Sequence, residues 1–264
     1  QDPTSNDTTQ WVARGVVEVS EAGVLEARVA GLGDFRLSIH RGESGLDAIP
    51  LVLHNVHQAV PALAGEVERR GLTRELVVPL DAAVVELSGG LPDTLCTSGF
   101  TLAAVGDIQT NAVHFQRIVQ ALHDEASHAE AAGRPLLGLV LLGDLSEDGT
   151  REELEAVDRI LRSAPVPTAA VPGNHDVFSA HDALYNEVYW PGNHAFDVCS
   201  AHFALFDTGS GDIAASVQGR LPELLATERR FLISGTHHPP FAAQATIGWT
   251  REDQAQHLIA ELAA

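Results

Sequence analysis

Chemically active side chains follow short apolar segments of this chain, and each time a glycine stands between the segment and the polar group. The polar residues in these positions are Asp107, Gln109, Asp144, Asn174, His175, Asp176 and His237. Carboxylate, amide and imidazole groups bind divalent cations and move protons. In an open α/β sheet, ligands bind at the carboxyl ends of the strands. If the apolar segments are neighbouring strands, we expect these side chains to converge on one site.

Each motif alone is a weak signal, because turn residues cluster in the same way without a function. Gly-Asp also occurs at 33–34 and 211–212, and Gly-Asn-His recurs at 192–194 with no apolar strand before it. We interpret these copies as turns and loops. The ordered occurrence of the other motifs, each after an apolar strand, is much more specific.

In this order the motifs resemble those of the calcineurin-like metallophosphoesterase superfamily, over about residues 98–264. The family pattern is Asp-x-His, Gly-Asp, Gly-Asn-His-Asp/Glu and a His in a His-x-Pro setting, followed by Gly-His-x-His. The resemblance implies an α/β fold with a calcineurin-like β-sandwich flanked by helices, and a hydrolase with a dinuclear metal centre. It further implies that Asp107 binds the first metal, that Asp144 bridges both metals, and that Asn174 and His237 bind the second.

The chemistry explains these residue types. A phosphate ester is anionic and repels hydroxide, so two cations about 3.5–4 Å apart are needed to neutralise it and to lower the pKa of a bound water. We expect Fe, Mn or Zn, and hydrolysis of a phosphomonoester or phosphodiester by a metal-bound hydroxide. The resemblance makes His175 the catalytic histidine that assists the leaving group, and Asp176 could fix its tautomer.

Two departures from the family pattern bear on activity. Gln109 stands where the commonest pattern has His, and its amide oxygen predicts a weaker first site or one for a harder metal. No Gly-His-x-His follows His238 in the sequence, so we expect a fragment or a truncated gene. The alternative function is a catalytically weak or inactive calcineurin-like fold that serves as a binding or scaffold module.

Some of these residues also have structural interpretations. Asp107 and Asp144 could cap the helices that follow them, and Gln109 could be a helix-start residue. Asp176 could simply form a turn. His237 stands two residues before a proline, as the family ligand does, and is therefore preferred over His238.

The segments around the motifs alternate between strands and helices, which is typical of a layered α/β domain. Strands are expected at 102–105, 136–142, 168–171, 202–206 and 231–234. Thr110 or Asn111 can cap a helix, Thr150 and Glu153 form a capping box for the next one, and a last helix begins near Glu252.

The region before the motifs differs from the rest. Residues 1–10 are a polar tail, and 11–97 form an N-terminal β-rich, sandwich-like accessory domain with one helical interlude at about 57–70. The Gly-Gly-Leu-Pro-Asp stretch at 89–93 is the best candidate for the boundary to a metallophosphoesterase domain at 98–264. The partner of the β-rich region stays unknown.

Charge and composition limit the partners. Asp and Glu number 36 against 16 Arg and no Lys, so the net charge is −20, which argues against general nucleic-acid binding. No apolar run approaches the ~20 residues of a membrane helix, so no membrane insertion is expected. The partner that the family resemblance implies is a small phosphate ester. The missing Met and the polar start favour a soluble, extracytoplasmic or secreted chain. Cys96 and Cys199 could pair or stay unlinked.

Overall fold

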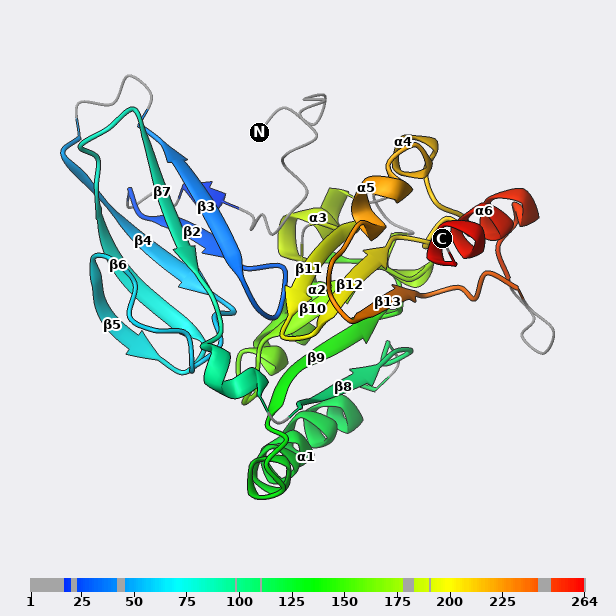
Figure 1. Cartoon of the computed structure of the whole chain (residues 1–264), viewed down its shortest axis with the longest axis horizontal. Helices are drawn as coiled ribbons and strands as arrows, with labels where there is room; N and C mark the ends of the chain where they lie inside the picture. Colours follow the sequence, from blue (N-terminus) through cyan, green and yellow to red (C-terminus); the bar gives the residue numbers. More distant parts are fainter. Residues whose placement is uncertain are drawn as a thin grey trace.

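The computed structural model describes residues 17–19, 23–41, 46–97, 99–109, 111–177, 183–189, 191–241 and 248–263. The predicted tail at 1–10, the first residues of the predicted β-rich region at 11–16, and Thr110 lie outside the described residues. The first part of the chain forms β-strands that lie beside a second part built from two further sheets and their helices (Figure 1).

Residues 17–89 form two sheets (Figure 1, blue and cyan). One sheet has the order β1 (Val17–Val19), β2 (Leu25–Arg28), β4 (Ala48–His54), β6 (Thr73–Pro79) and β5 (Glu66–Arg70). The other pairs β3 (Phe35–His40) with β7 (Val84–Gly89) in antiparallel fashion. Buried side chains from both sheets, such as Leu51, Leu76, Phe35 and Leu87, share one core. The predicted all-β character is confirmed, whereas the division of the chain into domains stays a prediction.

The predicted helix at about 57–70 is wrong. Glu66–Arg70 is strand β5, which pairs with β6 in a hairpin. Gly65 has a φ of +75°, and a Cβ there would lie 2.3 Å from the carbonyl oxygen of Val77, so the chain turns at a point where only glycine fits. Pro61 has no N–H to donate to a helix. Pairing with β6 therefore overrides the local helical pattern.

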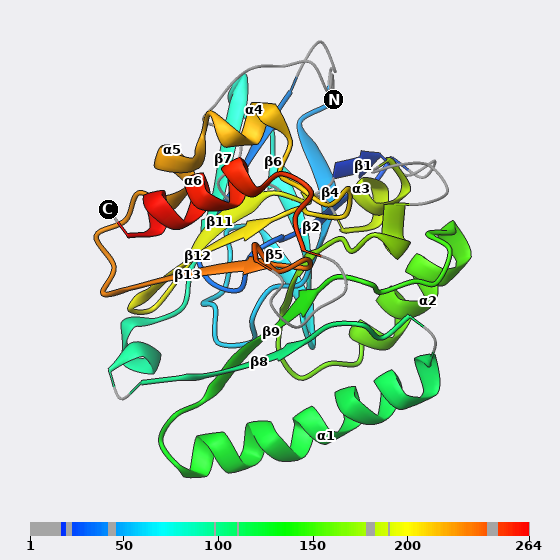
Figure 2. The same ribbon diagram turned by 90° about the vertical axis from the view of Figure 1, so that its right-hand side faces the viewer.

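Three of the four predicted strands before the polar motifs form a parallel sheet, while the fourth, at 231–234, belongs to a second sheet. The order of the parallel sheet is β10 (Thr168–Val171), β9 (Leu136–Leu142) and β8 (Thr101–Val105). The middle strand, β9, is apolar and buried almost throughout, as a strand covered on both faces should be. Helices α1 (Ala112–Ala131) and α2 (Arg151–Leu161) each follow one of the strands (Figure 2). Asn111 caps α1, and the capping box of Thr150 and Glu153 at α2 is confirmed.

A second sheet faces the first. Its strands are β11 (His194–Val198), β12 (Ala201–Phe206) and β13 (Phe231–Thr236), with β12 in the middle. The remaining helices are α3 (Ala183–Tyr189), α4 (Ala215–Gln218), α5 (Leu221–Leu225) and α6 (Glu252–Leu262). Leu137 and Val171 from the first sheet pack with Phe203 and Leu205 from the second in a shared core, while α5 and α6 cover the outer face. The sequence predicted a loop at 192–194, but His194 is the first residue of strand β11, so that prediction is wrong for this residue.

A disulfide and a buried asparagine connect the β-rich region with the rest of the chain. Cys96, at the end of the short 3-10 helix Asp93–Cys96, is bonded to Cys199 in the turn between β11 and β12, which resolves the open pairing. Asn55 follows β4, and its side chain hydrogen-bonds both the N–H and the carbonyl of Thr168 at the start of β10. The amide of Asn55 thus occupies the free edge of the parallel sheet as a neighbouring strand would.

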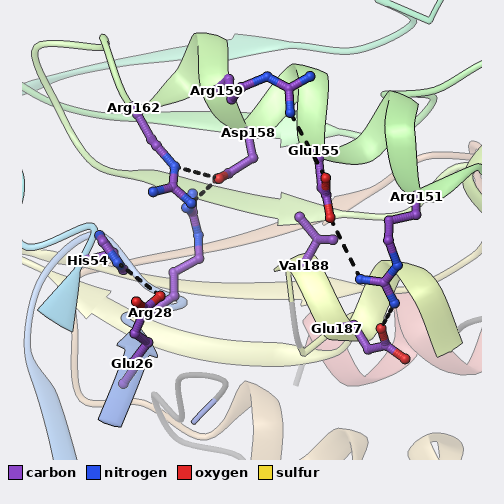
Figure 3. Close-up of a pocket in the computed structure, with 11 residues that line it drawn as sticks. Glu26, Arg28, His54, Arg151, Glu155, Asp158, Arg159, Arg162, Glu187 and Val188 are labelled. Atoms are coloured by element: carbon purple, nitrogen blue, oxygen red, sulfur yellow. Dashed lines mark hydrogen bonds and ion pairs between the residues drawn. The ribbon is translucent and has the colours of Figure 1, made fainter. Parts of the chain in front are cut away.

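An ion-pair network strengthens the same junction. Arg28 of β2 donates to Asp158 of α2 and to the hydroxyl of Thr168, and Arg162 donates to the second oxygen of Asp158. Arg28, Asp158 and Arg162 line a cleft of about 240 Å³ in which each arginine lies against an acid of the chain itself (Figure 3). Among the described residues, no helix is both long and apolar enough to cross a membrane.

Candidate metal centre

Asp107 and Asp144 occupy equivalent positions, each one residue beyond the glycine that ends a parallel strand. Both have left-handed backbone conformations, with φ values of 55° and 53°. The N–H of Asp107 donates to Gly143, and the N–H of Ile108 donates to the carbonyl of Asp144, so the two turns are joined. Asn111 and Thr150 cap the following helices. The capping interpretation of the two aspartates is therefore excluded, and their carboxylates are left for another role.

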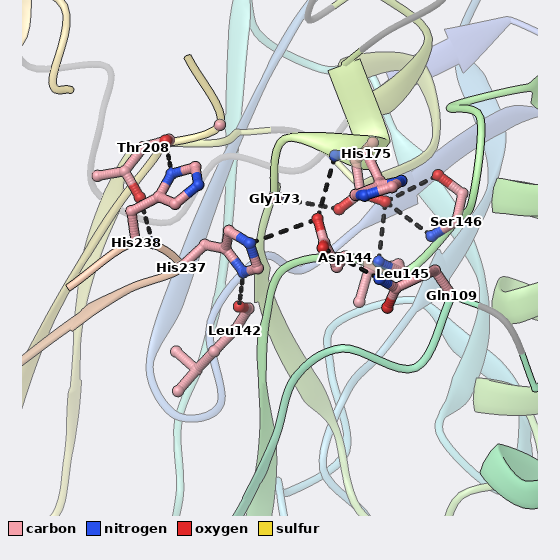
Figure 4. Close-up of polar contacts among 12 residues, drawn as sticks. Gln109, Leu142, Asp144, Leu145, Ser146, Gly173, His175, Thr208, His237 and His238 are labelled. Carbon is pink, nitrogen blue, oxygen red and sulfur yellow. Dashed lines mark hydrogen bonds and ion pairs between the residues drawn. The ribbon is translucent and has the colours of Figure 1, made fainter. Parts of the chain in front are cut away.

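His237 brings the end of β13 to these aspartates. One ligand atom from each of Asp107, Asp144 and His237 lies within 4.8 Å of the others. The Nδ1 of His237 is 2.8 Å from the carbonyl of Leu142, and its Nε2 is 3.4 Å from Oδ1 of Asp144 (Figure 4). A carbonyl only accepts, so Nδ1 carries a proton and Nε2 is the ring nitrogen that faces the carboxylate. Imidazole and carboxylate groups that converge in this way form a donor set that fits a divalent cation.

Gln109 lies at the same edge. Its Nε2 donates to Oδ2 of Asp144 at 3.2 Å, and its buried Oε1 has no hydrogen-bond partner among the described residues. An amide oxygen that is buried without a donor costs free energy, which a bound cation would offset. The contact with Asp144 places Gln109 in the predicted site, so the orphaned oxygen also fits a metal ion.

The turn that contains Asn174 and His175 packs directly on Asp144. The N–H of His175 donates to Oδ1 of Asp144 at 3.1 Å, and Asn174 lies half-buried just before it. The Nδ1 of His175 is 2.7 Å from the carbonyl of Glu147, which fixes this nitrogen as the proton donor. That carbonyl, with smaller contributions from nearby carboxylates, raises the pKa of His175 against the effect of burial. The Nε2 of His175 is then the nitrogen available for chemistry.

Asp176 does not orient His175, as the sequence suggested it could. Its Oδ1 accepts from the N–H of Leu145 and from both the N–H and the hydroxyl of Ser146, and its Oδ2 accepts from the N–H of Gly173. Burial raises the pKa of this carboxyl, while the four hydrogen bonds act in the opposite direction. Asp176 therefore ties the turn after β9 to the turn after β10, and the carbonyl of Glu147 orients His175.

Glycine is required where these turns meet. A Cβ on Gly173 would lie 2.1 Å from Oδ1 of Asp144, and one on Gly143 would lie 2.7 Å from the ring of His237. Neither position tolerates a side chain unless the proposed ligands move. The sequence located these glycines as turn formers, and the structure adds that they allow the close approach of the ligands.

Other residues of the site could not be recognised from the sequence around them. Ser146 and Glu147 contribute through contacts with a turn about thirty residues away in the chain, which sequence spacing does not reveal. His238 lies beside His237, but its ring is turned to Thr208 at the end of β12 (Figure 4). The structure thus brings His237, and not His238, to Asp144.

Comparison with known proteins identifies the family. The chain matches the model of the calcineurin-like phosphoesterase family over residues 100–259, and it belongs to that family. The predicted family and fold class are confirmed, and membership in this group of metallophosphoesterases implies divalent metal ions.

Two curated proteins are similar to part of the chain. A 3',5'-cyclic-nucleotide phosphodiesterase of Nostoc sp. is 30% identical over 119 residues, which are 42% of this chain and 45% of that protein. A "probable cyclic nucleotide phosphodiesterase" of Fibrobacter succinogenes is 24% identical over 109 residues, 39% of this chain and 41% of that protein. The matched regions therefore span less than half the length of these relatives.

Among solved structures, a purple acid phosphatase from yellow lupin (Lupinus luteus) seeds is similar to the chain with a TM-score of 0.46 and 12% identity. The match covers 82% of this chain and 51% of that protein.

Proposed function

We propose that this chain is a metal-dependent phosphoesterase whose centre lies at the carboxyl ends of β8, β9, β10 and β13. The convergence of Asp107, Asp144 and His237 within 4.8 Å is the observation that carries this proposal. These ligands come from turns far apart in the sequence, and the Nε2 of His237 faces Oδ1 of Asp144. The contact of Nδ1 with the carbonyl of Leu142 holds the ring in this orientation, which leaves Nε2 and the carboxylate placed to share a cation.

In this proposal the first metal is held by Asp107, Gln109 and Asp144, and the second by Asp144, Asn174 and His237. The ions are drawn from Fe, Mn or Zn. When bound, they would neutralise the phosphate and lower the pKa of a water molecule. Asp144 can serve both positions because its two oxygens face different partners, His237 on one side and Gln109 on the other.

His175 has the role of a general acid in the proposal. The carbonyl of Glu147 holds the proton on Nδ1, so a second proton is carried on Nε2 and can pass to the departing oxygen of the ester. Asp176 supports this geometry indirectly, because it fixes the turn on which His175 stands. Asp176 is therefore a positioning residue in the proposal.

The proposed substrate is a small phosphate ester. The relatives named as cyclic-nucleotide phosphodiesterases make cyclic nucleotides the first natural substrates to test. The net charge of −20 makes bound cations necessary for an anionic substrate to approach the site. We also propose an extracytoplasmic location, supported by the disulfide between Cys96 and Cys199, since such bonds persist in oxidising compartments.

Hydrolysis of chromogenic esters tests the function. The chain is stripped with EDTA, supplied with Mn²⁺, Zn²⁺ or Fe²⁺, and assayed with bis(p-nitrophenyl) phosphate and with p-nitrophenyl phosphate. We expect metal-dependent turnover that falls about 100-fold or more in Asp144→Ala. Asp124→Ala, which removes an exposed acid of α1, should leave turnover unchanged. Unchanged turnover in Asp144→Ala would place the site elsewhere, and no hydrolysis by the wild type with any metal would favour the binding-module alternative.

A further inference from the structure

His238 is a buried histidine that the proposed chemistry does not use. Its side chain is 5% exposed, and its Nδ1 lies 2.6 Å from the carbonyl of Thr208. Its own N–H donates to the hydroxyl of Thr208 at 3.0 Å. Both backbone and side chain of His238 are thus bonded to one fully buried residue, two positions beyond the end of the neighbouring strand β12.

The carbonyl of His238 is held as well. It accepts from the indole Nε1 of Trp249 at 2.9 Å and from the hydroxyl of Thr236 at 2.9 Å. Pro239 follows, and a residue before proline is restricted to extended conformations. The backbone after His237 is therefore fixed by partners from β12, from β13 itself and from the segment that leads to α6.

These contacts determine where His237 can point. Its ring meets the ring of His238 edge-on with centroids 4.8 Å apart, and its Nδ1 is bonded to Leu142 on the other sheet. His237 bridges the two facing sheets, so any displacement of residue 238 would move its Nε2 away from Asp144. The His237 ring is thus held by the carbonyl of Leu142 at Nδ1 and by contact with the ring of His238.

We infer that His238 is a positioning residue that holds His237 in its metal-binding orientation through the anchor to Thr208. The inference rests on the proposed metal centre. Metal-ligating histidines are commonly oriented by groups behind them, and loss of such groups weakens metal affinity about 10–100-fold. In this chain the carbonyl of Leu142 fixes the tautomer of His237, and the anchored His238 fixes its backbone.

Titration with Co²⁺, followed by its visible absorption, tests the inference without reference to catalysis. The variants are His238→Ala, which removes the side-chain bond to the carbonyl of Thr208, and His238→Asn, whose side-chain amide can still donate to that carbonyl. We expect His238→Ala to bind Co²⁺ about tenfold more weakly or worse, and His238→Asn to recover most of that affinity. His202→Asn is the matched control, because His202 is also buried but bonds Asp197 and Leu224 away from the ligands.

The outcomes separate the inference from the proposed function. If the wild type binds no Co²⁺, the metal centre itself is refuted. If the wild type binds Co²⁺ and His238→Ala binds it equally well, the metal centre stands and the positioning role is refuted. An equal loss of affinity in His202→Asn would also refute it, since the effect would then follow from general destabilisation. Circular dichroism of each variant shows whether it folds. If His238→Ala does not fold, His238→Phe, which keeps a ring but cannot donate to Thr208, takes its place with the same expected loss of affinity.

Discussion

Replacement of Asn55 should uncouple the β-rich region from the parallel sheet. The amide nitrogen of Asn55 donates to the carbonyls of Val29 at 2.6 Å and of Thr168 at 2.7 Å, and its oxygen accepts from the N–H of Thr168 at 2.8 Å. The side chain is buried, and Thr168 is 113 residues away in the chain. One residue thus satisfies one backbone group of the β-rich region and two of the parallel sheet.

The expected loss follows from these contacts. Each of the three hydrogen bonds contributes about 1 kcal/mol, and a buried group left without a partner costs about 1–3 kcal/mol, so Asn55→Ala should lose roughly 3 kcal/mol or more from hydrogen bonding alone. Asn55 also has a φ of 64°, a conformation that costs alanine about 1 kcal/mol relative to glycine. Asn55→Gly should therefore retain about 1 kcal/mol that Asn55→Ala loses.

Urea unfolding measures these differences as changes in the free energy of unfolding. Asn111→Ala is the matched control, because Asn111 makes one exposed capping bond to His114 and should lose only about 1 kcal/mol. A loss below about 1 kcal/mol in Asn55→Ala would refute the role of Asn55 at the junction, given the energies above. Equal losses of unfolding free energy in Asn55→Gly and Asn55→Ala would refute the cost assigned to the left-handed backbone conformation at residue 55.

Three further perturbations have defined outcomes. Asp176→Ala leaves four donors without their acceptor and should lower the free energy of unfolding by roughly 4 kcal/mol or more. Burial lowers the pKa of His57 and of His194 from 6.5 to about 4. The unfolded chain takes up protons on both below pH 6.5 and the folded chain does not, so stability should fall between pH 6.5 and 4, by up to about 3 kcal/mol for each group. Reduction of the bond between Cys96 and Cys199, which are 103 residues apart, should cost about 2–4 kcal/mol.

Each outcome has its own check by urea unfolding. Asp176→Asn keeps the acceptor at Oδ1 and should be less destabilised than Asp176→Ala; the reverse order would contradict the bonding described. His57→Gln should weaken the acid dependence, and an unchanged dependence would show that His57 does not cause it. Equal stability with and without dithiothreitol would contradict the contribution of the disulfide.

The sequence was sufficient to predict those helices and strands that have strong local patterns. Strands 136–142 and 168–171 are found with the predicted bounds, because a short apolar run between turn signals has few other structures open to it. The capping box at Thr150 was equally readable, since its two partners are three residues apart. The motif glycines located the site because they mark sharp turns at the ends of these strands.

Long-range contacts account for what the sequence did not reveal. The pairing of β5 with β6 replaced a predicted helix, and the bonds of Asp176 with Ser146 replaced a predicted contact with His175. Asn55 had no local signal at all, because its partner lies in another sheet. Whether Cys96 and Cys199 pair depended on the placement of the turn between β11 and β12, which composition and spacing do not determine.

The central claim is that Asp107, Asp144 and His237 hold a metal ion, and calorimetric titration of Mn²⁺ into the EDTA-treated chain tests it most directly. The account predicts saturable binding by the wild type and by the exposed-acid control Asp124→Ala, and loss of that binding in Asp144→Ala, which removes a carboxylate that lies within 4.8 Å of a ligand atom from each of the other two residues. Equal Mn²⁺ affinity in Asp144→Ala and the wild type would contradict it.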